Sequence, residues 1–128
     1  MSKKLTIKDL LAQKDQLKQK KRRRQTLHIE SLDAKIVIEE PSRALALEAI
    51  GMVQNDQGDV ADAYVVYNCV VEPNLKDPQL QKEFGCAEPT DIVDLIFRAG
   101  EISAISGQAL QLAGFGQGVK KVDEELKN

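Results

Sequence analysis

The sequence predicts a mainly α-helical fold with a small N-terminal β-hairpin, an α+β domain that follows a basic helical arm. Three observations predict it. Apolar residues recur at helical spacing through most of the chain after residue 41, they alternate only within residues 25–40, and residues 1–24 carry ten Lys or Arg but few apolar side chains. With 128 residues and no internal repeat, the chain has the length of a single compact domain.

Residues 1–24 are expected to form the arm. Thr6 can cap its first turn, and Asp9, three residues later, completes a box-like pair that satisfies free backbone N–H groups. Beyond this cap, Leu10, Leu11 and Leu17 form a thin apolar stripe among Lys, Gln and Asp. Such a helix buries little by itself, so the arm either packs along one narrow edge or binds a partner.

Residues 25–40 change from helical spacing to alternation, which predicts a β-hairpin. Leu27 and Ile29 alternate with polar residues in the first strand, and Ile36 and Ile38 do so in the second. The turn between them contains Asp33-Ala34, a weaker signal than Asp-Gly because alanine resists a positive φ. Two strands alone are marginally stable, so the hairpin must lie against helices.

Helix signals dominate the rest of the globular domain, which we place at residues 25–118. Ser42 can cap the first helix, Asp77-Pro78 can open the third, and Gly85 can close it. The helices are expected over about residues 42–53, 59–71, 78–84, 89–97 and 101–113, with a C-terminal tail at 119–128.

Spacing also predicts which face of each helix is buried. The expected buried positions are Leu45, Ala49, Met52 and Val53 on the first helix; Val60, Tyr64, Tyr67 and Val71 on the second; Ile92, Val93, Ile96 and Phe97 on the fourth; and Ile102, Ile105, Ala109 and Leu112 on the fifth. The core is therefore expected to be mostly aliphatic, since the chain has no Trp and few other aromatic residues.

Composition indicates where in the cell the protein is expected to act. No run approaches the ~18 apolar residues of a membrane span, and the first ten residues have no apolar stretch of signal-peptide length. The two cysteines, Cys69 and Cys86, form no C-x-x-C pair and fit a reducing compartment. We therefore expect a cytoplasmic protein that does not contact a membrane.

Residues suited to catalysis or metal binding are few, so we expect no enzyme, no cofactor and no metal. The single histidine, His28, falls on the outer face of a predicted strand, which disfavours a metal site or a nucleophile–base pair. Asp91 and Asp94 are explained by their place near a helix start. The glycine-rich stretch at 114–118 follows a helix rather than a strand, unlike a phosphate-binding loop.

Charge is divided unevenly along the chain. Residues 1–24 carry a net +8, from ten basic and two acidic residues, and residues 25–128 carry −10, from eight basic and eighteen acidic residues. The basic run is Lys20, Lys21, Arg22, Arg23 and Arg24.

Such a run has three interpretations: a nucleic-acid patch, a contact for an acidic protein, or a solvated helix end. Nucleic acid is disfavoured, because no aromatic residue lies within the first 60 positions to stack on a base and the acidic body would repel a polyanion. The arm could also lie on its own body or on that of a neighbouring copy.

Several strings in order resemble one known family. SLDAKIVIEEPSR, DAYVVYNCVVEPNLKDPQLQKEFGC, EPTDIVDLIFRAGEISAIS, LAGFG and the opening KKLTIKDLLAQKDQLKQKK are similar to the XkdN-like tail assembly chaperones of contractile-tailed phages and PBSX-like prophages. The resemblance covers nearly the whole chain.

The resemblance implies a non-enzymatic chaperone of phage tail assembly. Such proteins bind the tape-measure protein, help recruit tail-tube subunits, act in the cytoplasm of the bacterial host and are absent from the mature virion. The family supplies no catalytic or binding motif to carry over, so the candidate partner-binding residues are the arm's own Leu10, Leu11, Leu17 and basic run. Self-association of several copies is a further expectation, and the alternative function is a small nucleic-acid-binding regulator that uses the basic segment.

Overall fold

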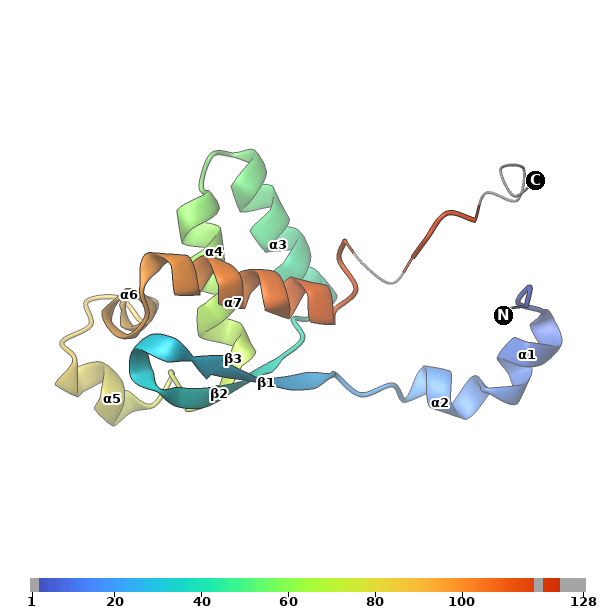
Figure 1. Ribbon diagram of the computed structural model, residues 1–128, viewed down its shortest axis with the longest axis horizontal. Helices are drawn as coiled ribbons and strands as arrows, with labels where there is room; N and C mark the ends of the chain where they lie inside the picture. Colours follow the sequence, from blue (N-terminus) through green and yellow to red (C-terminus); the bar gives the residue numbers. More distant parts are fainter. Residues whose placement is uncertain (1–2, 117–118, 123–128) are drawn as a thin grey trace.

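Helices cover one face of a three-stranded antiparallel sheet, and the N-terminal arm leads away from the first strand (Figure 1). The computed structural model describes residues 3–116 and 119–122. The elements in chain order are α1 (Ile7–Ala12), α2 (Lys14–Lys18), β1 (Arg24–Ile29), a 3₁₀ turn (Glu30–Leu32), β2 (Ala34–Glu39), α3 (Arg43–Gln54), α4 (Gly58–Cys69), β3 (Val70–Glu72), α5 (Pro78–Glu83), α6 (Asp91–Ile96) and α7 (Ala99–Leu112). The predicted fold class, a mainly helical α+β domain with a small hairpin, is confirmed.

The arm consists of two short helices rather than one. α1 ends at Ala12, and its cap residue Gln13 donates its N–H to the carbonyls of Asp9 and Leu10; α2 begins directly after Gln13. The basic run follows α2 as an irregular segment, and its last residue, Arg24, is already the first residue of β1. The interpretation of the run as a helix end is therefore wrong, because the last helical residue of the arm is Lys18.

The hairpin is confirmed, and its turn explains how the chain manages without glycine. β1 and β2 pair in register from Arg24 opposite Glu39 to Ile29 opposite Ala34. The left-handed conformation falls on Asp33, at φ 44°, and Ala34 is already extended. Aspartate adopts this conformation more readily than alanine does, so Ala34 does not need a positive φ.

A third strand was not predicted. The helix expected to reach residue 71 ends at Cys69, and Val70 to Glu72 form β3, which pairs with β2 through Ile38 opposite Val70 and Val37 opposite Glu72. Val70 and Val71 are β-branched and suit a strand, but helical spacing alone could not exclude them from the preceding helix. This third strand makes β2 the central strand and gives the hairpin the support that it needs.

The predicted buried face of the second helix is wrong. α4 buries Ala61, Val65, Val66 and Cys69, whereas Val60 is 57% exposed. Tyr64 and Tyr67 have helical spacing but are only half-buried, because the helix turns its smaller residues inward, where α3 and α7 approach closely.

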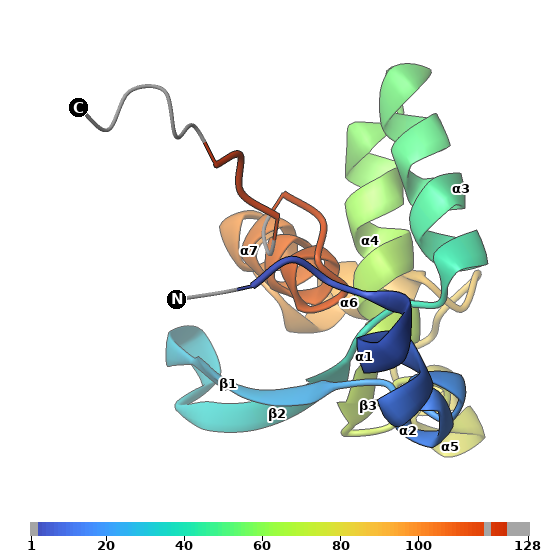
Figure 2. The same cartoon turned by 90° about the vertical axis from the view of Figure 1, so that its right-hand side faces the viewer.

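Ala46 and Ala49 make up the buried face of α3 in the same way, and the expected Val53 is exposed. Small residues on both helices allow α3 and α4 to lie side by side as an antiparallel pair (Figure 2).

The remaining helices follow their predicted signals closely. Asp77 caps α5 by accepting a hydrogen bond from the Leu80 N–H at 3.0 Å, Pro78 is the first helical residue, and Gly85 closes the turn at φ 65°. α6 begins two residues later than expected, at Asp91. On α7 the predicted Ile102, Ile105 and Ala109 are all buried, as predicted for the fifth helix.

The core is mostly aliphatic, as predicted, and joins the sheet to α4, α6 and α7. Its fully buried members include Ile38 at the centre of the sheet, Val66 on α4, Ile92 on α6, and Leu75, which lies in the loop after β3 and was not predicted. Of the predicted C-terminal tail, residues 119–122 are exposed and irregular, and residues 123–128 lie outside the described residues, as does Gly118.

Candidate partner-binding surface

The N-terminal arm, which carries several exposed apolar side chains, leads away from the sheet (Figures 1 and 2). The predicted Leu10, Leu11 and Leu17 are 42%, 66% and 42% exposed, and α1 and α2 bury none of their residues against the described part of the chain. Sequence reasoning missed Ile7, which is 76% exposed and precedes Leu10 and Leu11 by three and four positions. Those spacings place the three on one side of α1.

A reciprocal cap stabilises α1, although none of the helix's residues is buried against the described part of the chain. The Thr6 hydroxyl accepts from the Asp9 N–H at 3.1 Å, and the Asp9 carboxylate accepts from the Thr6 N–H at 3.1 Å, as predicted. The Lys3 ammonium lies 2.8 Å from the same carboxylate. The hydrogen bond from Lys3, followed by those from Thr6, lowers the pKa of Asp9 below its usual 3.8.

Acid is therefore expected to unwind α1 before the domain unfolds. Because the pKa of Asp9 is lower in the folded arm than in an unfolded chain, the cap's contribution is present above the usual 3.8 and is lost as the pH falls through the lowered pKa. Carbon chemical shifts of residues 7–12 measured by NMR against pH should move from helical toward coil values in that range.

Two variants control this measurement. Asp9→Asn should give less helical shifts at neutral pH with little further change in acid, and Asp15→Asn, in the first turn of α2, should leave the transition of α1 intact. A transition that persists unchanged in Asp9→Asn would contradict the assignment to this cap.

Three of the five basic residues pair with the protein's own sheet. The guanidinium of Arg24 lies 3.0 Å from the Glu39 carboxylate, and those of Arg22 and Arg23 lie 3.7 Å from Glu39 and Glu40. Around Arg23 the backbone takes part as well, because its N–H donates to the Glu40 carboxylate at 2.7 Å and its carbonyl accepts from the Glu40 N–H at 2.8 Å. These bonds fix where the arm leaves the sheet.

Lys20 and Lys21 make no ion pair with any described residue, so their charge is available. Together with Arg22, Arg23 and Arg43 they line a hollow of about 410 Å³ that also contains Glu40 and the cap of α3. With five cations around one carboxylate, the hollow is suited to an acidic segment of a partner. The structure therefore divides the predicted basic run into residues that anchor the arm and residues that remain free.

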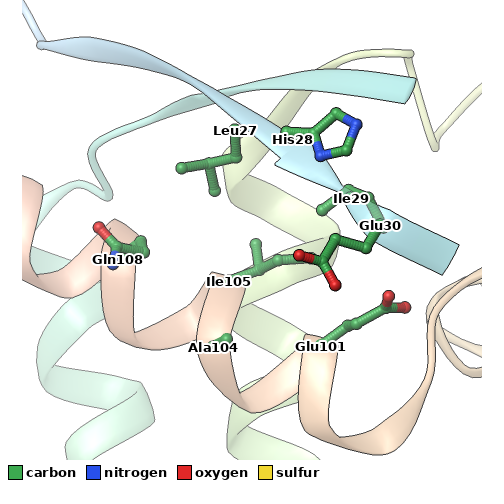
Figure 3. Close-up of a pocket in the computed structure, with 8 residues that line it drawn as sticks. All are labelled: Leu27, His28, Ile29, Glu30, Glu101, Ala104, Ile105 and Gln108. Atoms are coloured by element: carbon green, nitrogen blue, oxygen red, sulfur yellow. The ribbon is translucent and has the colours of Figure 1, made fainter. Parts of the chain in front are cut away.

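A second concave surface, which sequence reasoning missed, lies between β1 and α7 (Figure 3). This groove of about 340 Å³ is lined by Leu27, His28, Ile29 and Glu30 on one side and by Glu101, Ala104, Ile105 and Gln108 on the other. Alternation in the hairpin and spacing on α7 each indicated half of it, but only the packing of α7 against β1 brings the halves together.

Charges gather at one end of this groove. The carboxylates of Glu30 and Glu101 lie there close to each other, while His28 turns toward the other face of the sheet, as predicted (Figure 3). Glu101 accepts from the Arg98 N–H at 2.9 Å, and this bond, followed by one from Ser31, lowers the pKa of Glu101. The imidazole Nε2 of His28 lies 3.3 Å from the Asp33 carboxylate. The described residues contain no cluster of three or more His, Cys, Asp or Glu side chains that could hold a metal ion.

Two further observations bear on the expectations from composition. No helix within the described ranges is long and apolar enough to cross a membrane. Both cysteines are free thiols, Cys69 buried and Cys86 half-buried, and burial raises the pKa of the Cys69 thiol to about 11.

The geometry is that of a small α+β domain with a detached amphipathic arm, and comparison with known proteins gives its class. A family model described as phage XkdN-like tail assembly chaperone protein matches residues 3–127. The chain belongs to this family, the XkdN-like tail assembly chaperones of phages, as its sequence strings indicated.

The other comparisons add little. One solved structure, that of the bacteriophage HK97 tail assembly chaperone, is similar to the chain with 21% identity and a TM-score of 0.45, over 88% of this chain and 99% of the other. At that level the similarity carries no conclusion about fold or partners. No curated protein matches the chain.

Proposed function

We propose that this tail assembly chaperone binds the tape-measure protein of its phage through the N-terminal arm and helps bring tail-tube subunits to it. The observation that carries the proposal is the arm itself. It presents Ile7, Leu10, Leu11 and Leu17 to solvent on helices that bury nothing within the described chain. A tape-measure protein that is not yet enclosed by a tail tube exposes apolar helical surface, and an amphipathic helix can cover such a surface.

Charge supports the same role. Lys20 and Lys21 lie between the apolar arm and the sheet without ion-pair partners among the described residues, so they can attract an acidic stretch near the apolar contact. Arg22, Arg23 and Arg24 pair with Glu39 and Glu40 instead, which reduces the positive charge that a nucleic acid would meet. The alternative of a nucleic-acid-binding regulator is therefore less favoured than a protein partner.

The proposed function needs no chemistry. In the two grooves described above, basic or apolar residues predominate, and such surfaces are suited to binding rather than to bond cleavage. We place this activity in the cytoplasm of the bacterial host during assembly, with the chaperone absent from the mature virion. Several copies along one long partner would hold it by avidity, without a tight single contact.

Co-expression tests the proposal. With the chaperone present, most of the tape-measure protein from the same phage should remain in the soluble fraction and co-purify with it, whereas the tape-measure protein expressed alone should sediment. A chain that lacks residues 1–23 serves as the control, because it keeps every strand and helix of the body. Equal precipitation with and without the full chain would reject the proposal, and equal rescue by the truncated chain would reject the role of the arm.

A further inference from the structure

The outer edge of β1 is open. Strand order in the sheet is β1-β2-β3, so β1 is an edge strand, and no strand within residues 3–116 and 119–122 pairs with its other side. An unpaired edge presents backbone N–H and C=O groups that can pair with another strand. The groove between β1 and α7 runs along the same strand and adds apolar side chains next to these groups.

The hydrogen-bond pattern shows which residues face outward. The Glu40 N–H donates to the Arg23 carbonyl at 2.8 Å, and the register of β1 with β2 is continuous beyond that pair. Because backbone groups of an antiparallel strand alternate between its two sides, those of Arg23, Gln25, Leu27 and Ile29 face β2. The N–H and C=O groups of Arg24, Thr26 and His28 therefore face outward.

We propose that two copies of the chain associate through these β1 edges, in an antiparallel pair centred on Leu27. In this register Thr26 of one copy lies opposite His28 of the second copy, so both residues use their outward backbone groups. Two-fold symmetry repeats this pair of residues at the other end, and the two Leu27 side chains lie opposite each other at the centre. The strand is thus complementary to itself.

Charge outside the strand favours the same occupant. In an antiparallel pair the segment before Arg24 of one copy leads past Glu30 of the other, where Glu101 also lies at the end of the groove. The free cations Lys20 and Lys21 are thereby directed toward an acidic end of the second copy. Within one copy, like charges in the arm and like charges in the body repel each other. Between two copies, the basic arm of one attracts the acidic body of the other.

Proline at an outward position tests the pairing. In Thr26→Pro the lost N–H is one that faces away from β2 and pairs with no strand among the described residues, so the fold should remain. The dimer should weaken about tenfold or more, because two hydrogen bonds are lost across the symmetric interface. Thr26→Ala is the matched control, since it removes the exposed side chain and keeps the N–H. Sedimentation equilibrium measures the dimer, and circular dichroism checks the fold.

Disulfide trapping tests the register independently. Opposite residues in a non-hydrogen-bonded pair have Cα atoms about 4.5 Å apart, so Leu27→Cys should cross-link two copies under mild oxidation. Gln25→Cys is the control, because the two Gln25 residues would be roughly 13 Å apart in this register. Both variants carry Cys86→Ala, and the buried Cys69, with its pKa of about 11, forms little thiolate.

The outcomes divide cleanly. A dimer that weakens in Thr26→Pro but not in Thr26→Ala, with cross-linking of Leu27→Cys alone, supports the proposal. A wild-type chain that stays monomeric at all concentrations, a dimer unaffected by a well-folded Thr26→Pro, or equal cross-linking at both positions overturns it. If Thr26→Pro fails to fold, the two cysteine variants decide. Since the measurements use the chaperone alone, they do not depend on whether it binds the tape-measure protein.

Discussion

Replacing Ile38 with alanine should lower the free energy of unfolding by about 3 kcal/mol, within the range of about 2–5 kcal/mol for large-to-small changes at buried aliphatic positions. Ile38 is fully buried, at 0% exposure, in the central strand β2, and lies opposite Gln25 of β1 and Val70 of β3. Truncating it leaves a cavity where the sheet meets the helices, and β2, which is bonded to a strand on both sides, cannot move to fill it.

Chemical denaturation of the whole chain measures this change, with Ile7→Ala as the matched control. Ile7 is 76% exposed on α1, so the same chemical change there should alter stability by less than about 0.5 kcal/mol. A loss of less than 1 kcal/mol in Ile38→Ala, roughly the value for a surface site, would show that the sheet is not the centre of the core.

Converting Ile7, Leu10 and Leu11 to serine together should abolish most of the chaperone's ability to keep the tape-measure protein soluble. These side chains are exposed and α1 buries no residue against the described part of the chain, so the stability of the body should stay within about 0.5 kcal/mol of the wild type. If the three become even partly buried against the partner, their loss costs about 2 kcal/mol or more, which corresponds to a roughly thirtyfold weaker affinity.

Apolar side chains of broadly similar exposure on the body provide the control for this variant. Leu47 on α3, Val53 on α3 and Val60 on α4 are 51%, 56% and 57% exposed, and their joint conversion to serine removes a similar amount of apolar surface away from the arm. Co-precipitation and solubility of the tape-measure protein are compared between the two triple variants. Equal loss in both would mean that general surface hydrophobicity, not the arm, is responsible.

The parts of the fold that could be predicted depend on interactions between residues close together in the chain. Capping by Thr6, Ser42 and Asp77 depends on residues three positions apart, and the structure contains all three caps. Alternation in residues 25–40 depends on neighbours two positions apart, and the hairpin formed. Each of these signals acts within one turn or one pair of strands, so it can be recognised without knowing the rest of the chain.

The candidate site was only partly predictable for the same reason. Leu10, Leu11 and Leu17 were identified because an apolar residue among charged ones is visible in the sequence, but their exposure to solvent is visible only in the structure. The split of the basic run was not foreseen, because Arg22, Arg23 and Arg24 find Glu39 and Glu40 some 16 residues away, across the hairpin.

Sequence alone thus determined the helix caps, the hairpin, the unequal distribution of charge and the family. Each of these depends on residues that are close together in the chain, or on several short strings in the order that the family has them. Only the tertiary structure decided that Val70–Glu72 leaves a helix to join the sheet, that alanines rather than tyrosines and exposed valines face the core, and that β1 and α7 enclose a groove. The physical reason is that burial depends on which surfaces meet, and segments distant in the chain supply those surfaces.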